Sequence, residues 1–262
     1  MSINYKSLFL LNPKLIYLNH GSFGACFSDV HLARINWIDK LEQNPVHFIE
    51  DILKPELKNS RIALSNYIGC DYNDIVYTPN PTTAINTITN SLNNFNPGDE
   101  ILATNHEYGA MDKTWEYFCE VNKLIYKKQN IQIPVLNHKS FIEKFWEGVS
   151  KNTKIIFMSH ITSSTALIFP IKEICKRARA CGILTIIDGA HAPGHIELDI
   201  SSINPDIYVG ACHKWMCTPK GVSFLYVKKE LQTKVIRLTD ELADANYTIK
   251  KLQQKENLKC QN

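Results

Sequence analysis

The sequence predicts an α/β fold, with a mostly parallel central sheet flanked by helices. Short apolar runs alternate along the chain with amphipathic stretches, as strand and helix units of a parallel sheet do. The run Ile183–Ile187 is almost wholly apolar, which is typical of a central strand buried on both faces. With 262 residues, the chain can bury a large core in one big domain or two modest ones.

Helices are predicted where apolar residues recur at helical spacing. The first covers Ser28 to about Asn44, with Ser28 as its N-cap and an apolar face of Ile35, Ile38 and Leu41. The next covers about Val46 to Ile68, is interrupted by Pro55, and is followed by Gly69, which suits a helix C-terminus. The later helices are Thr82–Leu92, Tyr108–Val121, Lys139–Val149, one from near Pro170 to Gly182, and a charged helical segment from about Lys229 to the end of the chain.

Strands are predicted at the apolar runs between these helices. They are Ile75–Thr78, Ile101–Ala103, Leu124–Tyr126, Lys154–Met158, Ile183–Ile187, Ile207–Val209 and Gly221–Val227. A turn is expected at Pro97-Gly98-Asp99, and the polar stretch Gln253–Asn262 is expected to fray.

The charge balance and the cysteines restrict the classes of partner and the location. Lys and Arg number 29 against 26 Asp and Glu, and a net charge of +3 gives no electrostatic footprint for nucleic acid or an anionic membrane. The apolar runs are too short for a secretory signal or a membrane-spanning helix. Eight cysteines without regular pairing predict reduced thiols and a cytoplasmic location.

Polar residues follow the predicted strands. Because ligands of open α/β sheets bind beyond the carboxyl ends of the strands, these residues are the candidates for a site. They are Pro81-Thr82-Thr83, His106-Glu107-Tyr108, Ser159-His160-Ile161-Thr162-Ser163, Asp188-Gly189-Ala190-His191 and Cys212-His213-Lys214.

Asp188 and Lys214 are the most informative of these residues. A carboxylate at the end of a buried strand is costly to desolvate unless a cation faces it, although an Asp that caps the next turn is an equally good interpretation. Lys214 alone reads as a solvated surface lysine. Together, an acid for a pyridinium nitrogen and a lysine for an aldehyde are what pyridoxal phosphate requires of a protein.

A phosphate site and an aromatic partner would complete such a centre. Thr82 and Thr83 begin an amphipathic helix, where free backbone N–H groups and hydroxyls can hold an anion, although simple N-capping explains them equally well. Tyr108 begins another helix directly after a strand and could stack on a cofactor ring. A core or surface tyrosine is the commoner case.

Several linked motifs resemble the class V aminotransferase family, and within it the isopenicillin N epimerase-like proteins. The two most specific are Ile186-Ile187-Asp188-Gly189-Ala190-His191 and the run from His213 to Gly221. The segments Tyr17–Ala25, Pro79–Asn86, Glu107–Ala110 and Ser159–Ala166 resemble the family in the same order. The resemblance covers residues from about 15 to 235.

The resemblance implies the large domain of fold-type I pyridoxal-phosphate-dependent enzymes and a role for each matching residue. Lys214 would bind the cofactor covalently and move protons at the substrate α-carbon, and Asp188 would keep the pyridine nitrogen protonated. Tyr108 would stack on the ring and His191 would contact its hydroxyl side. The remaining matches are Thr82, Thr83 and His213 for the phosphate, Ser163 for a further cofactor contact, and Asn19 and His20 at the substrate entrance.

The resemblance also implies a homodimer, an amino acid substrate, and chemistry that begins at the α-carbon, whether epimerisation, transamination or β-elimination. The expected division is an N-terminal segment (1–30), a cofactor-binding domain (31–235) and a C-terminal tail (236–262).

The sequence departs from the family at two points. Ala211 stands where many relatives have Ser or Asn, so one phosphate donor is absent. The resemblance fades after about Gln232, where relatives continue into a domain whose arginine binds the substrate carboxylate, and Arg237 lies in a segment without a matching motif. A non-catalytic relative that keeps the fold is therefore the alternative hypothesis.

Two other kinds of site are weaker hypotheses. His191 and His195 could ligate a metal, but Pro193-Gly194 would break the helix that could align them. Cys212 and Cys217 lie near Lys214 and could serve a desulfurase, but small buried residues are the better interpretation of both.

Overall fold

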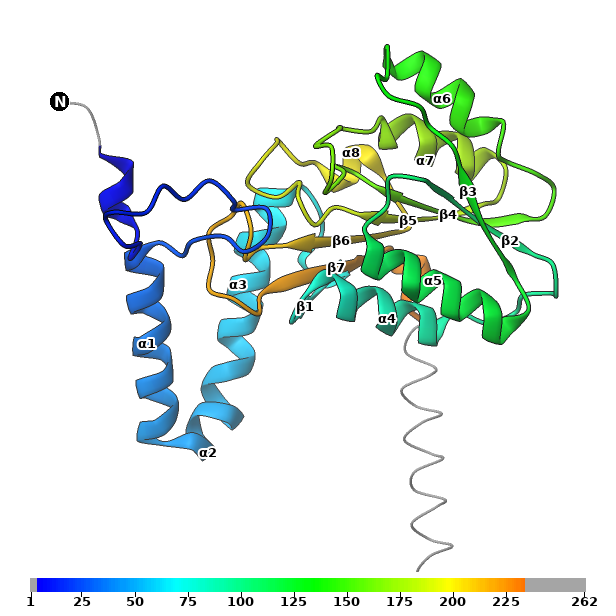
Figure 1. The fold of residues 1–262 in the computed structure, drawn as a ribbon. Helices are drawn as coiled ribbons and strands as arrows, with labels where there is room; N and C mark the ends of the chain where they lie inside the picture. Colours follow the sequence, from blue (N-terminus) through cyan, green and yellow to red (C-terminus); the bar gives the residue numbers. More distant parts are fainter. Residues whose placement is uncertain (1–3, 234–262) are drawn as a thin grey trace, which may run out of the picture.

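The computed structural model describes residues 4–233 and contains a seven-stranded mixed sheet in the order β1-β7-β6-β5-β4-β2-β3 (Figure 1). The strands are β1 (Ile75–Thr78), β2 (Glu100–Thr104), β3 (Ile125–Gln129), β4 (Thr153–Ser159), β5 (Leu184–Asp188), β6 (Ile207–Ala211) and β7 (Ser223–Val227). β7 runs antiparallel to both of its neighbours, and every other neighbouring pair is parallel. The predicted mostly parallel sheet is confirmed.

Helices cover both faces of the sheet, because the side chains of its central strands are apolar on both sides. In β4, Ile155 and Phe157 belong to the core cluster under α4 (Pro81–Ser91) and α5 (Gly109–Asn122). Ile156 and Met158 face the opposite cluster, under α3 (Leu53–Ile68), α6 (His138–Trp146), α7 (Ile171–Ala180) and α8 (Ile200–Ile203). The result is the three-layered arrangement seen in Figure 1.

The predicted helices are present, with corrected boundaries. α1 covers Ser28–Gln43, but Phe27 holds its N-cap position and no side chain caps it, so the prediction of Ser28 as the cap was wrong. Ser28 already lies inside the first turn. No residue of α1 is buried, so its predicted apolar face does not pack into the described core.

The interruption predicted at Pro55 lies just before that proline. A short helix, α2 (Pro45–His47), is followed by a π-helical turn, η2 (Phe48–Ile52), and then by α3. Pro55 has no N–H and its ring crowds the carbonyl four residues earlier, which favours a wider turn there. Gly69 ends α3 in the left-handed conformation with φ 68°, as predicted. Together α1 and α3 form a hairpin that projects from the sheet (Figure 1).

Shorter elements complete the described chain. They are the 3-10 turns η1 (Tyr5–Leu8) and η3 (Tyr72–Asp74). Residues 229–233 are helical, as predicted, and the remainder of the predicted C-terminal helix and its frayed end lie outside the described residues. No helix in the described part of the chain is long and apolar enough to span a bilayer.

The N-terminal segment packs against the turn that follows β6. The Gly24 amide donates a hydrogen bond to the carbonyl of His213 at 2.8 Å. A Cβ atom on Gly24 would lie 1.9 Å from the carbonyl oxygen of Lys214, so no other residue fits there without a backbone shift. The segment is thereby held beside the turn that carries His213 and Lys214.

Candidate functional site

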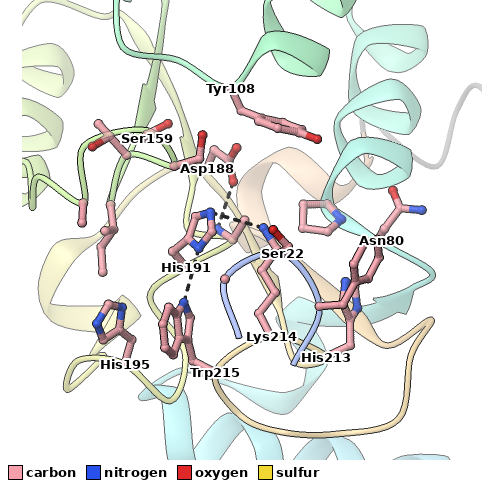
Figure 2. Close-up of a pocket in the computed structure, with 18 of the residues that line it drawn as sticks. Ser22, Asn80, Tyr108, Ser159, Asp188, His191, His195, His213, Lys214 and Trp215 are labelled. Atoms are coloured by element: carbon pink, nitrogen blue, oxygen red, sulfur yellow. Dashed lines mark hydrogen bonds between the residues drawn. The ribbon is translucent and has the colours of Figure 1, made fainter. Parts of the chain in front are cut away.

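A pocket of about 530 Å³ lies at the carboxyl ends of the parallel strands (Figure 2). Its lining comes from the N-terminal segment, the N-terminus of α4, and the loops after β2, β4, β5 and β6. All ten residues predicted for the site line it except His20 and Thr83; the eight are Asn19, Thr82, Tyr108, Ser163, Asp188, His191, His213 and Lys214. The sheet topology therefore brings together segments that are far apart in the sequence.

Asp188 is the last residue of β5 and is only 4% exposed. One carboxylate oxygen, Oδ1, accepts a hydrogen bond from the Ala190 amide at 2.9 Å, which fixes the side chain. Burial raises the pKa of Asp188, while the Ala190 N–H and the charge of Lys214 act in the opposite direction. The charged form of this buried group is one that a nearby cation would stabilise.

Lys214 lies in the turn after β6, and its Nζ is 3.3 Å from Nε2 of His191. Burial lowers the pKa of Lys214, and the charge of Asp188 partly offsets this. Burial, together with the charges of Lys214 and His195, lowers the pKa of His191 to about 4, so its ring is neutral at pH 7. A lysine whose ammonium form is disfavoured is a better nucleophile toward a carbonyl carbon.

Glu107 is a buried acid at the base of the site that the sequence did not single out for a role. Its Oε1 accepts a hydrogen bond from the Thr104 hydroxyl, and its Oε2 accepts from the Ser159 hydroxyl, each at 2.6 Å. Burial is the main cause that raises the pKa of Glu107 to about 7, and the charge of Asp188 adds to the increase. The hydrogen bonds from Ser159 and Thr104 act in the opposite direction. The sequence showed Glu107 only as a polar residue after a strand, and not that it lies between the ends of β2 and β4.

The N-terminus of α4 contributes to the pocket through Asn80, Pro81 and Thr82. Asn80 is the N-cap, and its side chain accepts a hydrogen bond from the Thr83 amide at 2.8 Å. Thr83 is exposed and does not line the pocket, so the structure does not place it at the predicted phosphate position. The cap is Asn80, so neither threonine holds the N-cap position that the competing interpretation gave to this pair.

His213 lines the pocket, and its Nδ1 lies 2.8 Å from the carbonyl oxygen of Val222. The Nδ1–H therefore donates to that carbonyl, and Nε2 is left for a ligand. Burial is the main cause that lowers the pKa of His213. A bound anion would act in the opposite direction, because it would stabilise the protonated ring, in which Nε2 donates.

Tyr108 is half-exposed and holds the N-cap position of α5. Figure 2 shows its ring on the opposite side of the pocket from Lys214. Ser163 and Asn19 are exposed residues of the lining.

His20 was expected at the substrate entrance, but it is not among the residues that line the pocket. Its ring packs against Tyr17 and Trp215, with centroids 5.1 and 6.0 Å away. Aromatic packing accounts for its position, because the imidazole fills the space between these rings.

Ala211 ends β6 and pairs with Ser223 of β7. Both residues are fully buried, and the Ser223 hydroxyl has no hydrogen-bond partner among the described residues. Directly opposite residues of an antiparallel pair project from the same face of the sheet. Position 211 therefore lacks the hydroxyl that many relatives carry, and the Ser223 hydroxyl on the neighbouring strand projects from the same face of the sheet without a partner.

The metal-site and desulfurase hypotheses can be compared with the described residues. Among residues 4–233, no group of three or more His, Cys, Asp or Glu side chains is arranged to hold a metal ion. Burial raises the pKa of Cys212 to about 12 and also raises that of Cys217, so neither thiol is a thiolate near neutral pH. Arg237 lies outside the described residues.

The donor set of the pocket fits pyridoxal phosphate. A buried carboxylate suits a protonated pyridine nitrogen, a lysine with a lowered pKa suits the aldehyde, and a helix N-terminus with His213 suits a phosphate. Ser22, Asn80, Ser159, His195 and Trp215 also line the pocket, although the sequence assigned them no role in a cofactor site.

Comparisons with known proteins agree with this fold. A family-wide sequence profile, aminotransferase class-V, matches residues 41–256. The isopenicillin N epimerase of Amycolatopsis lactamdurans is 31% identical over 222 residues, which are 84% of this chain and 56% of that protein. A probable chloroplastic L-cysteine desulfhydrase of Arabidopsis thaliana is 26% identical over 250 residues, 90% of this chain and 53% of that protein. The chain thus spans about half the length of these curated relatives.

Solved structures of similar fold include C-DES, in a form with glycine covalently linked to its PLP cofactor. It superposes with a TM-score of 0.78 at 22% identity, over 88% of this chain and 61% of that one. At this level of identity the match shows the fold, and it is the fold predicted from the motifs.

Proposed function

Because the chain belongs to the class-V aminotransferase family, we propose that it binds pyridoxal 5'-phosphate and acts at the α-carbon of an amino acid. The observation that carries the proposal is that the buried carboxylate of Asp188 and the amine of Lys214 line one pocket at the carboxyl ends of β5 and β6. When bound, the cofactor supplies an aldehyde that links to amines and a protonated ring that withdraws electrons from the α-carbon.

Asp188 has the properties needed to hold a proton on a ring nitrogen. It is buried and already fixed by the Ala190 amide. Because burial makes its uncompensated charge costly, a cationic N–H beside it would lower the pKa of Asp188 again. The same contact would keep the ring nitrogen protonated.

Lys214 has the properties needed for covalent binding and for moving a proton at the α-carbon. Burial lowers its pKa, which raises the fraction of free amine at neutral pH. The amine form accepts a proton and the ammonium form returns it, so one side chain can serve as both base and acid. The face to which the proton returns would decide between retention and inversion at that carbon.

The phosphate would bind at the N-terminus of α4, beside Thr82 and His213, where the helix dipole favours an anion. Tyr108 would cover one face of the ring, Ser163 would make a further cofactor contact, and Asn19 would line the substrate entrance. Epimerisation, transamination and β-elimination all begin with removal of the proton at the α-carbon. The relatives named above include both an epimerase and a probable desulfhydrase.

Exchange of the α-proton with solvent tests the enzymatic proposal whatever product is formed. The full chain, supplied with pyridoxal phosphate in D₂O, is incubated with the common L- and D-amino acids and followed by proton NMR. We expect exchange for at least one of them, abolished in Lys214→Ala and retained in the exposed control Lys151→Ala. Exchange that persists in Lys214→Ala would contradict the role of that lysine.

The alternative is a non-catalytic relative that keeps the fold and cofactor binding, since the chain spans about half of its curated relatives. Cofactor binding without α-proton exchange for any amino acid would favour it over the enzymatic proposal. A homodimer and a cytoplasmic location remain predictions, which sedimentation and cell fractionation can test.

A further inference from the structure

Trp215, which follows Lys214 directly, packs against the rings of two histidines. The His195 ring stacks on it with centroids 4.3 Å apart and an interplanar angle of 26°. The His20 ring lies on it at 6.0 Å and 27°. A Cβ atom on Gly21 would lie 3.4 Å from the indole Cζ2, so the N-terminal segment also lies against this ring.

The indole nitrogen of Trp215 makes a directional contact with His191. Nε1 lies 3.3 Å from Nδ1 of His191, and Nε2 of the same imidazole lies 3.3 Å from Nζ of Lys214, as Figure 2 shows. The three side chains therefore form a chain of contacts from indole to imidazole to amine. Gly21 also lies against this chain, because its Cβ would be 3.4 Å from Cε1 of His191.

The chemistry of the three groups fixes the position of one proton. An indole nitrogen can only donate, so Nδ1 of His191 must accept. A neutral imidazole that accepts at Nδ1 carries its single proton on Nε2, the nitrogen that faces Lys214. The neutral state agrees with the lowered pKa of His191, for which burial is the main cause.

We propose that Trp215 is a positioning residue that holds His191 in its Nε2–H tautomer, so that His191 presents a hydrogen-bond donor to the Lys214 amine. A donor at this place stabilises the free amine and disfavours the ammonium ion, which has no lone pair to accept it. With the opposite tautomer, a lone pair would face Nζ and favour the ammonium. The indole thus controls the nucleophilicity of Lys214 through His191.

The same donor would face a phenolic oxygen of a cofactor bound beside Lys214, and this second role rests on the proposed function. The first role concerns the protein without a cofactor. The titratable groups that face the chain of contacts come from four segments; they are Asp188 on β5, His191 and His195 after it, His213 and Lys214 after β6, and His20 of the N-terminal segment.

Nitrogen-15 NMR of the histidine rings tests the tautomer directly in cofactor-free protein. The signals of His191 are assigned by their loss in His191→Gln. We expect the Nε2–H pattern in the wild type, loss of that preference in Trp215→Phe, and its retention in His195→Phe. Trp215→Phe keeps an aromatic ring but lacks the N–H, whereas His195→Phe keeps both the indole N–H and a stacked ring.

The reactivity of Lys214 provides the second readout. The rate at which acetic anhydride modifies Lys214, measured by peptide mass spectrometry against pH, reports the fraction of free amine. We expect the rate at neutral pH to fall roughly three- to tenfold in Trp215→Phe, the change expected for half to one pKa unit, and to change far less in His195→Phe.

An Nδ1–H tautomer in the wild-type protein would overturn the proposal even if no variant folds. A folded Trp215→Phe protein with unchanged tautomer and unchanged Lys214 reactivity would also overturn it. Neither measurement requires pyridoxal phosphate, so failure of the proposed function would leave both results interpretable.

Discussion

The hydroxyl of Ser159 donates a hydrogen bond to Oε2 of Glu107 at 2.6 Å and thereby joins the carboxyl ends of β4 and β2 beneath the pocket. Oε1 of the same carboxyl group is 2.6 Å from the Thr104 hydroxyl, which could accept a proton held on Oε1. The site therefore contains a buried carboxyl group that can exist in either form near neutral pH.

Glu107 makes the stability of the fold depend on pH. Its pKa is about 7 in the folded protein against an ordinary value of 4.5, because burial disfavours the charge. Between these two pH values the folded state binds more protons than the unfolded state. The contribution of Glu107 to the unfolding free energy therefore falls as the pH rises toward about 7, and it is constant well above that pH. The full change is about 3 kcal/mol.

Glu107→Gln should remove this dependence, since an amide can accept from Ser159 and donate to Thr104 without titrating. Urea unfolding from pH 5 to pH 8 measures the effect as a difference between wild type and variant. We expect the variant to gain relative stability as the pH rises. The exposed control Glu120→Gln should follow the wild type, and a difference that does not change with pH would contradict a titrating Glu107.

Gly24→Ala should disturb the turn that carries Lys214. The new Cβ would lie 1.9 Å from the Lys214 carbonyl oxygen and 2.8 Å from that of His213, and backbone atoms cannot move aside as a flexible side chain can. We expect a loss of about 1–3 kcal/mol in unfolding free energy and weaker binding of pyridoxal phosphate.

Gly109→Ala is the matched control, because no atom lies within 4 Å of the added Cβ and the residue begins α5. We expect this variant to unfold within about 1 kcal/mol of the wild type. Equal effects of the two substitutions would contradict the close packing of the N-terminal segment on the turn.

Asp188→Asn should weaken cofactor binding and catalysis more than folding. An asparagine keeps the volume and the acceptor for the Ala190 amide, but it loses the charge that would hold a ring proton. We expect affinity for pyridoxal phosphate or turnover to fall at least about tenfold, equivalent to about 1.4 kcal/mol. Urea unfolding and cofactor titration, beside the exposed control Asp29→Asn, measure the two effects separately, and unchanged turnover would count against the assigned role.

The fold was predictable from the sequence because its strands are short apolar runs and its site residues follow them. Ile183–Ile187 is the clearest example, since an almost wholly apolar run must be covered on both faces. The antiparallel direction of β7 was not predictable, because a short apolar run has the same hydrophobic pattern in a parallel and in an antiparallel strand. The N-cap of α1 was wrong for a local reason, as Ser28 lies one residue inside the helix.

The site was predictable where a motif places a residue at a strand end, as for Asp188 and Lys214. Glu107 and Trp215 received no role, because their importance depends on neighbours from distant segments. Ser159 lies far from Glu107 in the sequence, and His191 and Trp215 meet only when β5 and β6 pair. Thr83 and His20 match the family motifs but do not line the pocket; the Thr83 amide is paired with the Asn80 cap, and the His20 ring packs against Trp215.

The covalent attachment of pyridoxal phosphate to Lys214 is the central claim, and borohydride trapping tests it most directly. The protein is incubated with pyridoxal phosphate, reduced, digested and analysed by peptide mass spectrometry, with Lys214→Ala treated in parallel. We predict one phosphopyridoxyl group on the peptide that contains Lys214, on that residue, and none in the corresponding peptide of the variant. An unmodified Lys214, or label confined to another lysine such as Lys220, would contradict the account.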